Sequence, residues 1–111
     1  MAAGTYNFTL DQGSTFSRQL TVEDNNTAMD LSGYSGRMQM RSTHDSATIA
    51  LSFTVVVANA AQGKLNVTAS ATSTAALTPG IYVYDLEIES SAGSVTRLME
   101  GTITVKPEVT R

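Results

Sequence analysis

The fold is decided by two adjoining segments, GIYVYDLEIE at residues 80–89 and SVTRLMEGTITV at residues 94–105. Apolar and polar residues alternate along much of both segments, and this period of two is typical of strands with one packed and one wet face. The short polar stretch between the segments suits a turn. The pair therefore predicts a long β-hairpin and points away from a helical catalytic scaffold.

The register of this hairpin follows from its charges and from a turn at Ser91-Ala92-Gly93. A three-residue loop with glycine in the left-handed position sets Glu87 opposite Arg97 and Leu86 opposite Leu98. A loop one residue longer or shorter would lose the charge pair, which contributes about 0.2–1 kcal/mol across a ladder. The inward-facing set is then Tyr82, Tyr84, Leu86, Ile88 and Leu98, and the outward-facing set is Asp85, Glu87, Glu89 and Arg97.

Shorter alternating segments fill the rest of the chain. They cover residues 5–10, 16–22, 34–41, 49–55 and 64–68, and polar or glycine-containing turns separate them. Residues 69–77 have weak helical character, and their Ser and Thr content favours one short turn over a full helix. We therefore expect an all-β fold, a single immunoglobulin-like antiparallel β-sandwich of about seven to eight strands with at most one short helical turn. It would occupy residues 1–111 as one domain with short extended termini.

Composition excludes several classes of protein. The chain has 111 residues, a net charge of −3 and no cysteine, so disulfides and thiolate-bound metals are not expected. Its seven Lys and Arg residues are scattered, which argues against a nucleic-acid partner. Neither a signal peptide nor a membrane-spanning apolar run is visible, so we expect no membrane partner. The lack of cysteine also fits assembly in a reducing cytoplasm.

Two groups of polar residues are candidates for chemistry. His44 and Asp45 could contribute to a catalytic triad, but a polar loop without a Gly-x-Ser-x-Gly turn favours a plain loop histidine. Asp85, Glu87 and Glu89 share a strand face and could bind Ca²⁺ or supply an acid/base pair. The favoured alternative is a solvated face whose charge is offset by nearby arginines, namely Arg97 with Arg37 and Arg41.

Two pairs of apolar residues are candidates for binding. Tyr82 and Tyr84 could stack on a sugar, although core tyrosines are commoner in a sandwich strand. Met38 and Met40 could form an adaptable partner surface, with core packing favoured. Phosphate-binding glycine loops, zinc spacings and heptads are missing from the sequence. We therefore expect no catalytic, cofactor-binding or metal-binding residue and no enzymatic activity.

Four segments carry a resemblance to a known group of proteins: YNFTLDQG at residues 6–13, LSGYSGRMQMR at 31–41, GIYVYDLE at 80–87 and EGTITV at 100–105. Over most of its length the chain resembles short proteins of tailed-phage structural gene clusters. It is similar to the immunoglobulin-like N-terminal domain of phage baseplate upper proteins. The resemblance implies a non-enzymatic virion structural protein, a tail or baseplate component that docks onto other proteins. The alternatives are a capsid decoration (cement) protein and, in a different class, a carbohydrate- or receptor-binding module.

The same resemblance implies partners and a location. Other virion structural proteins and further symmetric copies of the chain are the expected partners, in a virion assembled in the host cytoplasm. The terminal segments, residues 1–5 and 106–111, are polar and non-periodic, and each could add a strand to a neighbour's sheet. Baseplate proteins continue into a receptor-side region, whereas this sequence stops at Arg111, which weakens a receptor-binding role.

Overall fold

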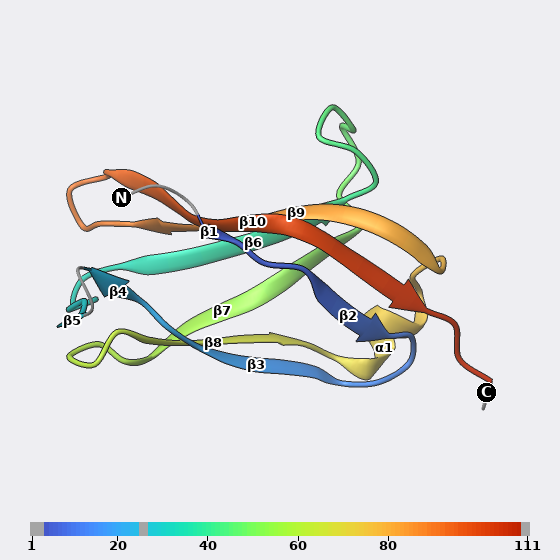
Figure 1. The fold of residues 1–111 in the computed structure, drawn as a ribbon, viewed down its shortest axis with the longest axis horizontal. Coiled ribbons are helices and arrows are strands. Elements are labelled where there is room, and N and C mark those ends of the chain that lie inside the picture. The colour runs from blue at the N-terminus through green and yellow to red at the C-terminus, as the bar shows by residue number, and fades with distance from the viewer. Residues whose placement is uncertain (1–3, 25–26, 110–111) are drawn as a thin grey trace.

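The computed structural model describes residues 4–24 and 27–109, and strands dominate it (Figure 1). A mixed sheet runs in the order β1-β10-β9-β6-β7-β8-β3, β2 also pairs with β10, and β4 and β5 form a separate ribbon. The bounds are β1 Gly4–Thr5, β2 Phe8–Asp11, β3 Phe16–Thr21, β4 Glu23–Asp24, β5 Thr27–Ala28, β6 Ser35–Arg41, β7 Leu51–Asn59, β8 Lys64–Ala69, α1 Ala71–Ala75, β9 Gly80–Glu89 and β10 Val95–Lys106. The expected all-β fold is confirmed.

The sheet curls because β7 belongs to both of its halves. The first residues of β7 pair with β6, and those from Thr54 onward pair with β8. The two halves enclose one apolar core, in which Met40, Leu65, Leu86 and Ile103 are almost fully buried. Every second residue of β8 is buried, as the period of two predicts.

The expectation of a purely antiparallel arrangement is wrong at the N-terminus. β1 and β2 run parallel to β10, with Gly4 opposite Met99 and Phe8 opposite Ile103. Most of the chain separates these strands, which supplies the long connection that parallel neighbours need. Gly4, Thr5 and Lys106, expected in free tails, are therefore paired within the sheet. Residues 1–3 and 110–111 of those tails lie outside the described residues.

Between β1 and β2 the chain lies directly against Gly101 of β10. A Cβ atom at Gly101 would collide with the carbonyl oxygen of Tyr6. That oxygen accepts a hydrogen bond from the Tyr84 hydroxyl at 2.6 Å, and Oδ1 of Asn7 accepts one from the Thr102 N–H at 3.0 Å. Side-chain hydrogen bonds and a glycine at position 101 thus fix the N-terminal strand to the sheet.

The predicted hairpin register is confirmed from the turn to the pair Glu87 and Arg97, and it is wrong by one residue along the rest of the ladder. Glu87 lies opposite Arg97, and the glycine of the three-residue turn has a φ of 91°. A β-bulge at Leu98 then shifts the ladder by one residue, so Leu86 faces Met99 and not Leu98. Leu98 is buried and Met99 packs against the core, so two consecutive side chains point inward. A strand without a bulge would place these two neighbouring side chains on opposite faces of the sheet.

The expected short helical turn is α1. The Ser70 hydroxyl accepts a hydrogen bond from the Ser73 N–H at 3.2 Å and so caps the helix. Thr74 is fully buried, and its hydroxyl donates to the Ser14 carbonyl at 2.8 Å, which ties α1 to the start of β3. Across residues 4–24 and 27–109, no helix has the length and apolar character needed to cross a membrane.

Candidate binding surface

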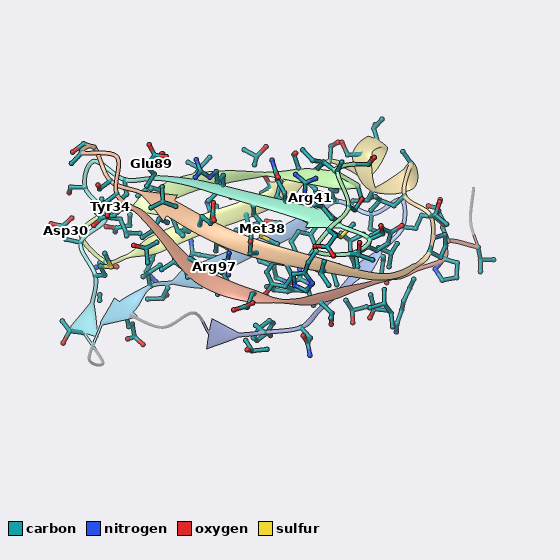
Figure 2. The ribbon with its side chains drawn as sticks, turned by 90° about the horizontal axis from the view of Figure 1, so that it is seen from above. Asp30, Tyr34, Met38, Arg41, Glu89 and Arg97 are labelled. Carbon is teal, nitrogen blue, oxygen red and sulfur yellow. The ribbon has the colours of Figure 1, made fainter. Side chains whose placement is uncertain are left out.

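The outer face of β6, β9 and β10 carries charged residues from all three strands, among them Arg41, Glu89 and Arg97 (Figure 2). Because β9 lies between the other two strands, the ladder register arranges the outward side chains in rows. Three successive rows are Arg37, Glu87 and Arg97, then Gln39, Asp85 and Glu100, then Arg41, Val83 and Thr102. Residues far apart in sequence therefore share one surface.

Ion pairs fix part of this face. Arg37 binds both Glu87, with Nε 2.9 Å from Oε1, and Glu89, with Nη1 3.1 Å from Oε1. The hydrogen bond to Glu87 raises the pKa of Arg37 above its usual value. Nε of Arg97 lies 3.5 Å from Oδ2 of Asp85, so Arg97 leans to the row beside its cross-strand partner. Arg37 and Arg97 thus offset the carboxylates on β9, as predicted, but the expected charge pair of Glu87 with Arg97 is not formed within the described residues, and Arg41 pairs with none of these carboxylates there.

A shallow depression of about 280 Å³ lies over the same strands and brings in His44 from the loop after β6. Arg41 is held beside it, because Nη1 donates to the Ser46 carbonyl at 2.8 Å and Nη2 to Oε1 of Gln39 at 3.1 Å. Glu100 lines the opposite side of the depression. The sequence alone did not predict that His44, Arg41 and Glu100 lie together. The alternation along residues 37–41 and 83–87 was the available signal that these strands share an outer face.

The chemistry available to this surface is ionic and hydrogen-bonding. His44 and Asp45 are exposed, and Asp45 does not line the depression. Among the described residues, no group of three or more His, Cys, Asp and Glu side chains could hold a metal ion. The disfavoured alternative, Ca²⁺ binding by Asp85, Glu87 and Glu89, therefore gains no ligand set from the described residues. The arrangement suits contacts with the charged groups of another molecule.

Three of the four apolar candidates lie in the core. Tyr84 is 4% exposed, and burial raises the pKa of its hydroxyl above the usual range. Tyr82 is half-buried, and its hydroxyl donates to the Thr78 carbonyl. Met38 and Met40 are buried, so the favoured interpretation as core residues is confirmed for Met38, Met40 and Tyr84, whereas Tyr82 packs against the core with part of its surface exposed. The sugar-stacking alternative loses Tyr84.

Comparisons with known proteins inform the fold alone. No family model matches the chain, and no curated protein matches it. Among solved structures, CopC from Methylosinus trichosporium OB3b is similar, with a TM-score of 0.51, 14% sequence identity, and coverage of 100% of this chain and 90% of that chain. In all, 122 solved chains match, and a likeness at 14% sequence identity shows the fold and no activity.

The phage assignment is wrong on these findings. CopC, the similar structure named above, is not a phage protein, and neither the family models nor the curated proteins link the chain to a tail, baseplate or capsid decoration protein. The quoted motifs consist of strand alternation and turn glycines, which any sheet of this kind requires. They therefore carried fold information and no family information. The expected virion location rested on that resemblance and has no support of its own in the structure.

Proposed function

We propose that the protein is a non-catalytic interaction domain that associates with a second copy of itself through the outer face of β6, β9 and β10. The carrying observation is a pair of opposite charges on this face, Arg41 and Glu100, that form no ion pair within the described residues. Arg41 lies on β6 opposite Val83 of β9, and Glu100 lies on β10 opposite Asp85 of β9. The two residues therefore flank β9 on opposite sides, in adjacent rows. A two-fold axis crossing β9 there sets Arg41 of each copy against Glu100 of the other.

Charge balance and apolar exposure support this self-association. The face carries three guanidinium groups and four carboxylates, from Arg37, Arg41, Arg97, Asp85, Glu87, Glu89 and Glu100. A nearly neutral mixture of both signs can pair with itself, whereas a face of one sign would repel its copy. Ile81 of β9 lies on the same face and is 69% exposed, so a face-to-face pair would bury it.

The absence of catalysis is part of the proposal. Its support is the open, solvent-facing position of His44, with no Ser, Thr or Cys among the described residues lining the depression. Catalytic sites combine a held nucleophile and base in a partly enclosed cleft. A hydrolytic activity abolished by His44→Ala would contradict the proposal.

We also infer the finer description of the fold, an immunoglobulin-like sandwich. β10, β9 and β6 would form one layer and β8 and β3 the other, with β7 passing between them. The single core between the two halves supports this description. An experimental structure in which β3 pairs with β2 and closes the sheet into a barrel would contradict it.

A charge-swap experiment tests the interface. Sedimentation equilibrium of the wild-type protein should give a dimer, and Arg41→Glu or Glu100→Arg should each weaken dimerisation about ten-fold, because each sets like charges face to face. The double variant restores opposite charges and should recover wild-type association. Lys64→Glu, a charge reversal on β8 in the other half of the sheet, is the matched control. A wild-type protein that stays monomeric at millimolar concentration, or a double variant no better than the singles, would refute the proposal.

A further inference from the structure

The outer edge of β3 is unpaired. Of the strands within residues 4–24 and 27–109, only β8 pairs with β3, and the sheet ends there. The Val22 N–H donates to the Gly63 carbonyl at 2.7 Å, in the same register that pairs Leu20 with Leu65. Antiparallel ladders bond alternate residues to one neighbour, so the even-numbered residues of β3 bond to β8. Ser17, Gln19 and Thr21 therefore direct their N–H and C=O groups to the open edge.

A mainly apolar groove of about 320 Å³ lies beside this edge. Leu20, Thr21, Val22 and Glu23 line it on the side of β3, and Leu86, Leu98 and Met99 line it on the side of β9 and β10. The bulge at Leu98 creates the second wall, because it turns two consecutive side chains of β10 inward. β2 pairs with β10 only from Ile103 to Lys106, at the end of that strand far from the groove (Figure 1), whereas β1 borders the groove because Gly4 lies opposite Met99.

The side chain of Arg18 covers part of the open edge of β3. Arg18 lies at an even, inward position between Phe16 and Leu20, where edge strands otherwise carry apolar residues. Its guanidinium carbon lies 4.7 Å from the centroid of the Phe16 ring, and Nη1 donates to the Ser17 carbonyl at 2.9 Å. That carbonyl belongs to the open edge, so the side chain folds over the groups that an added strand would need. An inward-pointing charge on an edge strand opposes edge-to-edge pairing.

The same arginine opposes pairing of β3 with a copy of itself. If two β3 strands paired antiparallel about Gln19, each Arg18 would face Leu20 of the other copy, with the two guanidinium groups close together. A partner strand with a carboxylate opposite Arg18 would pair with β3 favourably. Its carboxylate would draw the guanidinium away from the Ser17 carbonyl and replace that hydrogen bond with a stronger one between opposite charges.

We propose that the β3 edge docks an extended acidic segment of a partner protein, with Arg18 selecting a carboxylate and the groove taking its apolar side chains. The added strand would bond to the backbone of Ser17, Gln19 and Thr21, and its inward apolar residues would contact Leu20. The surface lies apart from the outer face of β6, β9 and β10, so this inference goes beyond self-association through that face.

A pair of peptides tests the charge selection. The probe acetyl-Val-Thr-Val-Thr-Glu-Thr-Val-amide, antiparallel to β3, places its glutamate opposite Arg18 and valines opposite Phe16, Leu20 and Val22. Titration into ¹⁵N-labelled protein should shift the amide signals of β3, and the peptide with lysine in place of glutamate should bind about ten-fold more weakly. In Arg18→Glu the preference should reverse. Equal affinity for both peptides, or no shifts in β3, would overturn the proposal.

A proline variant tests the backbone contact. The Gln19 N–H points away from β8, so Gln19→Pro removes a donor from the open edge and leaves the ladder with β8 complete. We expect Gln19→Pro to lose peptide binding while its thermal midpoint stays close to that of the matched control Gln19→Thr. Equal binding by the two variants would overturn the proposal. Arg41→Glu should bind the peptide normally, which separates this site from the dimer face.

Discussion

Replacing Gly101 should release the N-terminal strand from the sheet. Gly101 of β10 has no room for a side chain, because the carbonyl oxygen of Tyr6 occupies the position that a Cβ atom would need. The obstacle is backbone and not the end of a flexible side chain, so only movement of the strand itself can relieve the overlap. Gly101→Val therefore forces residues 4–11 away from β10, whereas Gly101→Ala demands a smaller shift.

The size of the effect follows from the contacts of this strand. Three hydrogen bonds outside the regular ladder hold it, each with a net contribution of about 1 kcal/mol. They join the Tyr6 N–H to the Glu100 carbonyl, the Tyr84 hydroxyl to the Tyr6 carbonyl, and the Thr102 N–H to Asn7. Phe8 is 7% exposed, and its partial release adds about 1–2 kcal/mol. We expect Gly101→Val to lower the free energy of unfolding by about 3–5 kcal/mol.

Urea unfolding followed by far-UV circular dichroism measures this loss. Asn7→Ala removes one of the three hydrogen bonds and should cost about 1 kcal/mol, which calibrates the scale. In the Gly101→Val background, Tyr84→Phe should have almost no further effect, because the Tyr6 carbonyl has already moved away. A Gly101→Val protein within about 0.5 kcal/mol of wild type would refute the argument, since that is the range of an inconsequential surface change.

Three other predictions follow from burial, ionisation and capping. Burial raises the pKa of Tyr84, so the contribution of its neutral hydroxyl to the free energy of unfolding should be fully present below pH 10 and fall above it by up to about 1.4 kcal/mol per pH unit. The urea midpoint should therefore fall less between pH 9 and pH 11 in Tyr84→Phe than in the wild-type protein, and an equal fall in the two proteins would contradict this prediction. Met40→Ala, at a position with 0% exposure, should cost about 2–5 kcal/mol in urea unfolding, against less than about 0.5 for Val56→Ala at 53% exposure. Ser70→Ala should cost about 1 kcal/mol by removing the cap of α1, and an unchanged thermal midpoint would rule out that role.

The hairpin shows how far sequence reasoning reaches. The turn glycine, the pairing of Glu87 with Arg97 and the inward tyrosines all follow from short-range rules, because period and loop length fix a local register. The bulge at Leu98 does not follow from them. In the segment LMEGTI, residues 98–103, the alternation fits a strand with either its odd-numbered or its even-numbered residues facing the core. The structure packs both Leu98 and Met99 against the core, which only the bulge allows. The parallel placement of β1 and β2 was hidden for a similar reason, since it depends on an edge formed by the last strand of the chain.

The candidate surface was predictable only in parts. Alternation placed Arg37, Arg41 and the β9 carboxylates on outer faces, and the structure pairs Arg37 with Glu87 and Glu89 as that alternation suggests. Which strands lie side by side was not deducible, because β6 and β9 pair across an interval of more than forty residues. The resemblance to phage proteins failed for a related reason. Its motifs record what a strand or a turn needs locally, and those needs are shared by unrelated proteins.

The β-bulge at Leu98 affects only one of the two proposed binding surfaces. Before Leu98 the ladder sets Arg97 opposite Glu87, and after it Glu100 lies opposite Asp85, so both charges face outward. Without the extra residue, the ladder would still place Arg97 and Glu100 on that face, but one inward side chain fewer would line the groove beside β3. The insertion thus leaves the outer face unchanged and shapes only the groove. Because each surface depends on different residues of β10, one chain could bind its copy through one half of the sheet and an acidic strand along the edge of the other.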